Sequence, residues 1–145
     1  MRVLFVAVLV LLSCAASGFA SESVGTVKTV AGKALIERQG QLLVASVGVP
    51  VYAYDRLLTR GDGALGVILK DDTSVSLGPD SEMRISEYVF APREGGFSVV
   101  LKMLKGTFLY MSGVIGKLAP EAIRLETPDS TIAVRGTRLL IKISS

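Results

Sequence analysis

The residues with the clearest chemical potential are three aspartates that lie close together in the sequence. Asp71-Asp72 and Asp80 could offer carboxylate oxygens to a calcium ion, which prefers oxygen ligands. Their spacing does not match the twelve-residue loop of an EF-hand. Aspartate is also frequent in turns, because its side chain hydrogen-bonds the neighbouring backbone. We therefore favour turn positions for these three residues, and also for Asp55 and Asp62.

The chain has serine and threonine hydroxyls that could act as nucleophiles, but it has no histidine to activate them. The chain has no histidine, which excludes a histidine-dependent triad, a histidine metal ligand and a histidine pH switch. A lysine would have to act as the base, and no Gly-x-Ser-x-Gly elbow occurs. The hydroxyl residues considered are Ser74, Ser76, Ser81, Ser98 and Thr107. We expect no catalytic residue, no cofactor and no enzymatic activity.

Arg135 is the residue best suited to bind an anion. Its guanidinium group and the amides of the turn at Gly136 and Thr137 would both favour negative charge. The alternative is that Arg135 caps turn carbonyls or pairs with an acid such as Asp129. We favour this structural role, because one arginine makes a weak anion site.

The charge of the chain gives little support for a nucleic-acid partner. The isoelectric point is about 9.2, yet the formal net charge is only +3. The basic residues are scattered, and no run of them is dense enough to follow a phosphate backbone. We expect no nucleic acid among the partners.

The composition predicts an all-β fold. Half of the residues are hydrophobic but only 6% are aromatic, and fifteen glycines and five prolines interrupt the sequence. Turn signals recur about every ten residues, which favours many short strands over long helices. This spacing is typical of a β-sandwich, a barrel or a short-rung solenoid, and periodicity does not choose among them. We expect one domain over residues 21–145.

Three stretches in the second half of the chain are predicted not to be strand. Pro92 to Gly96 is expected to be a polar loop, and Lys105-Gly106 a turn between strands at 97–104 and 107–110. Ser112 to Ala122 is expected to be a loop, because Gly113 and Gly116 bracket Val114-Ile115 within it. Residues 120–122 could form one helical turn.

The C-terminal residues read as a β-turn-β unit that closes on the rest of the sheet. Pro128 ends the first strand near Thr127, and residues 131–134 alternate with strand period. Gly136 then predicts a bulge, a bend or a close backbone approach. The last strand, residues 139–143, would have a free edge, so it is a candidate for self-association or for pairing with another chain.

The N-terminus reads as a targeting segment. Met1-Arg2 is a short positive region, residues 3–12 are apolar, and small residues follow, which predicts a signal peptide over residues 1–20 with cleavage after Ala20. The alternative is a lipobox at residues 11–14, with Cys14 lipidated and the protein tethered to a membrane. Cys14 is the only cysteine, so no disulfide or thiol catalysis is expected elsewhere. Either way we expect a periplasmic or secreted protein, or an anchored lipoprotein.

Four stretches in this order resemble the ferric-citrate regulator (FecR) domain family. They are Val47 to Ala64, Asp71 to Ser81, Leu104 to Phe108, and Thr127 to Thr137. The resemblance implies a periplasmic all-β domain like a twisted β-solenoid, with a β-sandwich as the alternative. It also implies that the motif residues are fold-defining turns. These are Asp55, Thr59, Gly63, Asp71, Asp72, Gly78, Gly106, Pro128, Arg135, Gly136 and Thr137.

Regulatory members of that family carry a receptor signal across the membrane to a cytoplasmic segment that binds a sigma factor. Here only Met1-Arg2 precede the apolar segment, and the sequence ends at Ser145, so we expect a stand-alone exported member without transmembrane signalling. Our first hypothesis is a non-enzymatic interaction or scaffold module that binds a protein of the bacterial cell envelope. The alternatives are a periplasmic sensor subunit with a separate transmembrane partner, and a binder of small ligands or polysaccharide.

Overall fold

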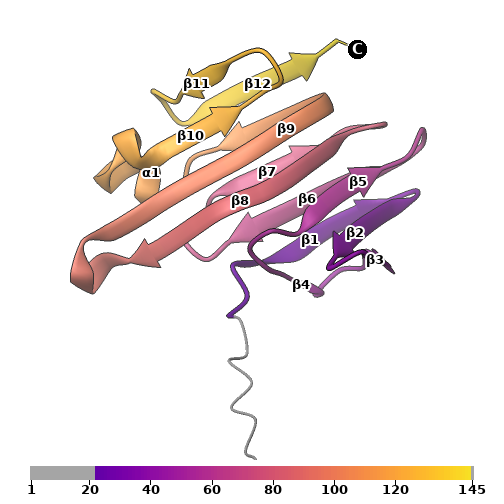
Figure 1. The fold of residues 1–145 in the computed structure, drawn as a ribbon, viewed down its shortest axis with the longest axis horizontal. Helices are drawn as coiled ribbons and strands as arrows, with labels where there is room; N and C mark the ends of the chain where they lie inside the picture. Colours follow the sequence, from indigo (N-terminus) through magenta and orange to yellow (C-terminus); the bar gives the residue numbers. More distant parts are fainter. Residues whose placement is uncertain (1–21, 145) are drawn as a thin grey trace, which may run out of the picture.

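The computed structural model describes residues 22–144, which form twelve strands, one short α-helix and two single 3-10 turns (Figure 1). The signal peptide and Cys14 lie outside the described residues. The strands are β1 (Gly25–Ala31), β2 (Ala34–Arg38), β3 (Gln41–Val44), β4 (Pro50–Val51), β5 (Arg56–Thr59), β6 (Ala64–Leu69), β7 (Ser74–Leu77), β8 (Glu82–Ala91), β9 (Gly96–Met111), β10 (Ile123–Glu126), β11 (Thr131–Ala133) and β12 (Arg138–Ile143).

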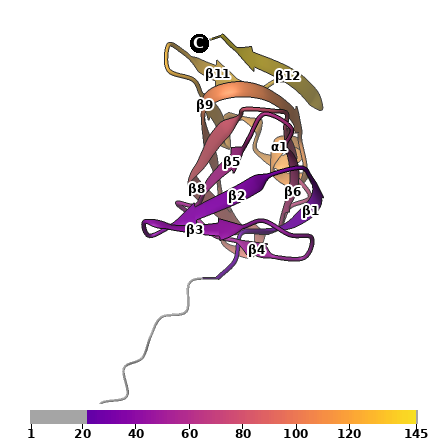
Figure 2. The same ribbon diagram turned by 90° about the vertical axis from the view of Figure 1, so that its right-hand side faces the viewer.

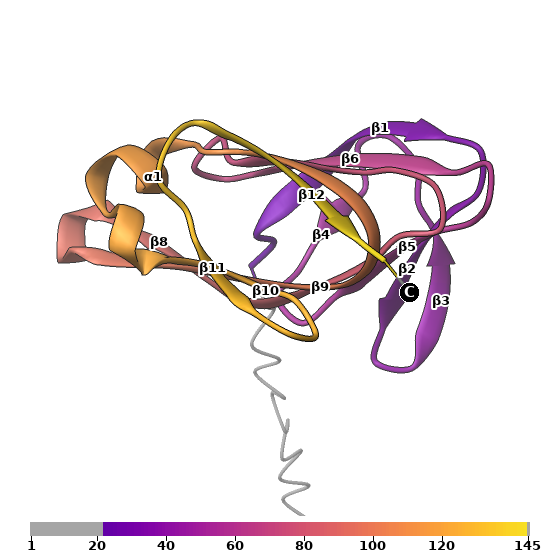
Figure 3. The ribbon, with the colours of Figure 1, turned by 90° about the horizontal axis from the view of Figure 1, so that it is seen from above.

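The strands form one sheet that curls into two facing layers, so the expected all-β fold is confirmed (Figure 3). Layer A has the order β4-β1-β6-β7-β9-β12, and layer B has the order β3-β2-β5-β8-β9-β10-β11. Strand β9 belongs to both, because residues 96–105 pair in layer B and residues 106–111 pair in layer A. The result is a curled half-barrel built of stacked arches, of which β3 and β4 occupy one end and β11 and β12 the other (Figures 1 and 2).

Four arches cross from one layer to the other along a common edge, which we call the corner edge (residues 32–33, 60–63, 78–81 and 105–106). Backbone hydrogen bonds join successive corners. The Arg60 amide donates to the Lys33 carbonyl at 3.0 Å, and the Asp80 amide donates to the Arg60 carbonyl at 3.2 Å. These bonds satisfy backbone groups that would otherwise be unpaired where the ladders break, so the arches stack in register.

The core lies between the layers and is almost wholly aliphatic. Alternate residues of each strand point inward, as strand period requires. Paired rows of fully buried side chains cross each layer, namely Ile36, Leu57, Met83 and Met103 in layer B and Val27, Val67, Val75 and Tyr110 in layer A. Burial of such side chains stabilises the fold by about 1.5–3 kcal/mol each.

The turn expected at Lys105-Gly106 is wrong, because β9 continues through these residues without interruption. Gly106 has φ +100, and a Cβ atom there would lie 2.0 Å from Oγ of Ser81. The glycine therefore bends a continuous strand around the corner edge and does not reverse the chain. A glycine in the sequence does not by itself distinguish a bend from a reversal, because the contact that requires glycine comes from Ser81 in the β7–β8 corner.

The loop expected over Ser112 to Ala122 is also partly wrong. Residues Val114–Leu118 form helix α1, while Pro120–Ala122 form the expected single helical turn. Gly113 and Gly116 disfavour a helix locally. The helix forms because Ile115 is fully buried and closes the edge where the two layers separate, opposite the corner edge. The polar loop at 92–96 contains a 3-10 turn at Pro92–Glu94.

Position 106 requires glycine for two reasons, namely its positive φ and the close approach of Ser81. A substitution at Gly136 measures the effect of a positive φ without such a contact. Gly136 has a similar φ of +110 but nothing lies within 4 Å of its would-be Cβ. We expect Gly106→Ala to lower the free energy of unfolding by about 4 kcal/mol, because strain and a clash with Ser81 add. Gly136→Ala should lower it by only about 1–2 kcal/mol. Urea unfolding of both variants measures the difference, and equal losses would contradict the corner contact.

Candidate functional site

Asp55 lies immediately before β5 and is a buried partner of an arginine. Its carboxylate accepts bonds from Nε of Arg38 at 2.9 Å, from Nη2 of Arg38 at 2.7 Å and from the Tyr52 amide at 2.9 Å. The side chain is 1% exposed, and Arg38 also stacks 4.4 Å from the centre of the Tyr52 ring. The hydrogen bond with Asp55 raises the pKa of Arg38. Asp55 thus fixes the β4–β5 connection against β2.

Thr59, Gly63, Gly78 and Ser81 build the corner edge. The hydroxyl of Thr59 donates to the Gly78 carbonyl at 2.6 Å and accepts from the Ser81 amide at 2.9 Å. A Cβ at Gly63 would lie 2.2 Å from the Lys33 carbonyl oxygen. Ser81, a candidate nucleophile by residue type, is 1% exposed, and its Oγ accepts from the Thr107 amide at 3.0 Å. These groups serve the fold, and Ser81 is a structural residue that the turn signals did not single out.

Asp71 is the centre of a buried hydrogen-bond network at the other edge of the layers. Its Oδ2 accepts from the hydroxyl of Thr73 at 2.7 Å and from the amide of Ile115 at 3.1 Å. Its Oδ1 accepts from the hydroxyl of Tyr88 at 2.8 Å. The Asp71 carbonyl accepts from the amide of Val114 at 2.7 Å. One residue therefore joins the β6–β7 turn of layer A, strand β8 of layer B and the first turn of α1.

The neighbouring Asp72 has a different environment. It is exposed, with φ +68 in the left-handed region that aspartate tolerates. Asp80 is exposed at φ +49 in the β7–β8 corner. Both carboxylate oxygens of Asp71 accept hydrogen bonds from protein groups inside the molecule, whereas Asp72 and Asp80 are exposed to solvent. This arrangement does not support a calcium site shared by the three aspartates. Within residues 22–144 no group of three acidic or thiol side chains is arranged to hold a metal ion.

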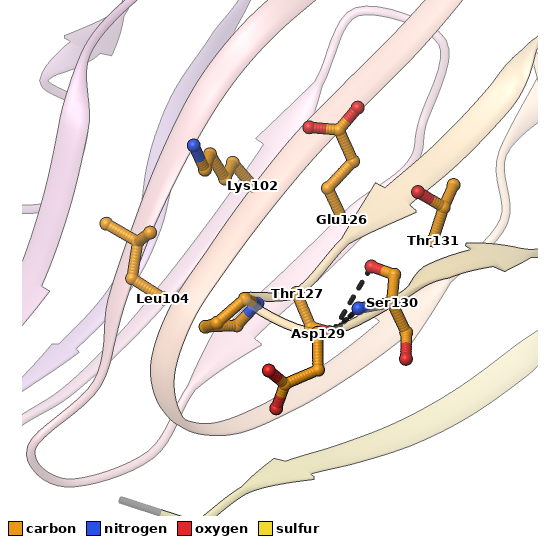
Figure 4. Close-up of a pocket in the computed structure, with 8 residues that line it drawn as sticks. Lys102, Leu104, Glu126, Thr127, Asp129, Ser130 and Thr131 are labelled. Carbon is orange, nitrogen blue, oxygen red and sulfur yellow. Dashed lines mark hydrogen bonds between the residues drawn. The ribbon is translucent and has the colours of Figure 1, made fainter.

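The C-terminal motif residues form the connections of the closing unit. Pro128 lies in the β10–β11 turn, where the Ser130 amide donates to the hydroxyl of Thr127 at 3.1 Å. Figure 4 shows this turn beside a shallow open depression, with Lys102 and Leu104 of β9 on its other side. The carbonyls of Gly136 and Thr137 accept from the hydroxyl and the amide of Ser112, at 3.2 and 2.9 Å.

Arg135 is exposed and belongs to no ion pair formed among residues 22–144, so the alternative pair with Asp129 is not present there. Of the eleven motif residues, Thr59 and Gly106 lie within β5 and β9 and the others lie at several separate connections. The structure does not bring them together at one surface. Their contacts fix corners and turns, and they assemble no nucleophile with a base.

One surface that could bind another molecule is the free edge of β12. Among residues 22–144 this strand pairs with β9 alone, and β11 pairs with β10 alone. Leu139, Ile141 and Ile143 point toward the core, whereas Arg138, Leu140 and Lys142 point outward and are exposed. Unpaired amide and carbonyl groups along a strand edge can add a further strand. No helix among the described residues has the length and apolar character that crossing a membrane requires.

The Asp71 network can be tested against its exposed neighbour. Asp71→Asn replaces one of the two acceptor oxygens by an NH2 group, which cannot accept a hydrogen bond. Either the Tyr88 hydroxyl, or the Thr73 hydroxyl and the Ile115 amide, therefore loses its acceptor. We expect a loss of about 2–4 kcal/mol in the free energy of unfolding, because buried donors are left unpaired. Asp72→Asn should change it by less than about 0.5 kcal/mol. Chemical unfolding of both variants measures this contrast, and a neutral Asp71→Asn would refute the role of the network.

The same network predicts a loss of stability at alkaline pH. Burial raises the pKa of Tyr88, and its bond to Asp71 raises it further. Burial also raises the pKa of Tyr110. Unfolded tyrosines ionise near pH 10, so the stabilising effect is complete below about pH 10 and is lost as the pH rises above it. The free energy of unfolding should fall above that pH, and less steeply in Tyr88→Phe. Identical slopes would contradict this assignment.

Comparison with protein families gives one assignment. The family model described as "FecR protein" matches residues 55–145, which is more than half of the chain. The match begins at β5, so the first four strands precede it. Comparison with curated proteins and with solved structures finds no match. The extent of the family match, together with the all-β fold, shows that the chain belongs to the FecR family.

Proposed function

We propose that this chain is an exported, non-enzymatic interaction module of the bacterial cell envelope that binds a partner protein at the free edge of β12. Membership of the FecR family supports a regulatory signalling domain associated with the envelope. The finer proposal depends on one observation, the unpaired edge of β12 with its exposed cations. The partner would add a strand to layer A, so main-chain hydrogen bonds would supply part of the affinity.

The charges on β12 indicate the chemistry of this partner. Arg138 and Lys142 flank the exposed Leu140 on the outer face. Residues opposite each other on adjacent strands have Cβ atoms about 4.5–5.5 Å apart, where opposite charges stabilise the pair and like charges destabilise it. A strand with acidic residues on either side of an apolar residue fits this edge. Such complementarity favours the correct partner and speeds association.

Self-association through the terminal strand was the other expectation for this edge, and the charges disfavour it. In an antiparallel pair of two β12 strands centred on Leu140, Arg138 of each copy lies opposite Lys142 of the other. Two like-charge contacts would then form at one short edge. The positive charges of Arg138 and Lys142 thus disfavour pairing between two β12 strands.

A periplasmic sensor subunit with a separate transmembrane partner is the second candidate, and family membership favours it. The two proposals share the β12 edge and differ in the partner, which would be a membrane-embedded signalling protein in the second case. A small-ligand or polysaccharide binder has less support. Neither the depression at residues 126–131 nor that at residues 133–136 is lined by an aromatic side chain.

The test is a site-specific crosslink in living cells. A photo-reactive amino acid replaces Leu140, which is 69% exposed, or Val89 on β8, which is 38% exposed. We expect a defined crosslinked envelope protein at position 140 and none at position 89. Its yield should fall by at least about tenfold in Arg138→Glu/Lys142→Glu, because that change replaces attraction by repulsion.

The matched control is Lys28→Glu/Lys33→Glu, which makes the same charge change at two exposed lysines away from β12. It should leave the crosslink unchanged. Loss of the crosslink in both double variants would show a general effect of net charge and would contradict the β12 edge. The intact mass of the recovered chain reports localisation. A start at Ser21 supports a soluble exported protein, and a lipidated Cys14 supports a tethered one.

A further inference from the structure

The end of the stack opposite β12 has an unusual composition. Residues 39–54, which include β3, β4 and the connections around them, contain no charged side chain. Four large apolar side chains in this stretch are solvent-exposed, with exposed fractions of 58% for Leu42, 77% for Val44, 67% for Val47 and 70% for Tyr54. Exposed apolar side chains concentrated in one uncharged stretch indicate a candidate interaction surface.

Strand β3 is the free edge of layer B within this stretch. It pairs with β2 through four residue pairs, and no other strand within residues 22–144 pairs with it. Natural edge strands are normally protected by lysine, proline or a bulge. The four residues of β3 are Gln41, Leu42, Leu43 and Val44, and its pairing with β2 is regular, so none of these protections is present.

We propose that β3 is a self-association edge, at which two copies of this chain pair antiparallel about a two-fold axis. Cross-strand partners must lie on the same face of the extended sheet. Leu43 is directed toward the core, and Leu42 and Val44 are directed outward. A register that keeps paired side chains on the same face places Leu43 opposite Leu43 of the second copy, and Leu42 opposite Val44 of the second copy.

The side chains make this register favourable. Leu42 and Val44 would cover each other on the outer face, and each would remove exposed apolar surface from water at about 25 cal/mol per Å². No charged residue of β3 opposes another, in contrast to a pair of β12 strands, where Arg138 would oppose Lys142. The composition of the two edges therefore assigns self-pairing to β3 and leaves β12 to a different partner.

This interface goes beyond the proposed function and does not depend on it. Joining two β3 strands would place the two β12 edges at opposite ends of one dimer, because β3 and β12 lie at opposite ends of the stack (Figures 1 and 2). A dimer of this kind is bivalent for whatever binds β12. The short strand predicts a weak, concentration-dependent dimer rather than an obligate one.

Sedimentation equilibrium of the full-length chain over a wide concentration range tests the proposal. We expect reversible dimerisation of the wild type. Leu42→Lys/Val44→Lys and Leu42→Glu/Val44→Glu should each weaken it by at least about tenfold, because like charges then face each other. An equimolar mixture of the two variants should recover a heterodimer. This rescue requires both variants to be folded, and circular dichroism of each confirms that they are.

Leu140→Lys is the matched control, because Leu140 is 69% exposed on the edge of β12. It should leave dimerisation unchanged. A wild type that stays monomeric overturns the proposal, and so does a dimer that survives both β3 variants. Binding of a monomeric wild type to lipid vesicles, lost in Leu42→Lys/Val44→Lys, would assign the patch to a membrane surface instead. None of these readouts involves the β12 crosslink, so the two proposals fail separately.

Discussion

The two layers of this protein depend on one buried carboxylate at the edge where no strand connects them. Along the corner edge the layers are joined covalently by the arches themselves. At the opposite edge the segment that carries α1 crosses from β9 in layer A to β10 in layer B. Asp71 adds hydrogen bonds between the layers there, because its oxygens accept bonds from Thr73 in layer A, Tyr88 in layer B and Ile115 in α1. A charged group is costly to bury unless each lone pair finds a donor. The network meets that condition, and it positions α1 so that Ile115 completes the core.

At the corner edge the main constraint is the close approach of neighbouring arches. Successive arches approach each other so closely that side chains are excluded at Gly63 and Gly106, and hydroxyl groups of Thr59 and Ser81 supply the bonds that the broken ladders lack. A hydroxyl is small and both donates and accepts, so it fits where two backbones meet. Construction of the sheet therefore explains the motif residues Thr59, Gly63 and Gly106.

The two ends of the stack differ in their chemistry, and this difference organises the functional proposals. The β12 end presents cations on alternate outward positions, while the β3 end presents only uncharged residues. The edge strands of an open sheet have unpaired backbone groups that can bind another chain, whereas a closed barrel has no such edge. Like charges on an edge strand disfavour its pairing with the same strand of a second copy, and an uncharged edge strand has no such repulsion. One open sheet can thus carry two interfaces of distinct specificity.

The sequence by itself determined the all-β class, most strand positions in the closing unit and the assignment of the motif aspartates to turns, because alternation and turn chemistry are local. It also allowed the resemblance to the FecR family to be stated. Only the tertiary structure decided that Gly106 bends a continuous strand and that residues 114–118 form a helix. In both cases the deciding contact comes from a residue distant in sequence, Ser81 for the bend and Asp71 for the helix. The unequal burial of Asp71 and Asp72, adjacent and chemically identical, has the same origin, since burial depends on which elements pack over a turn.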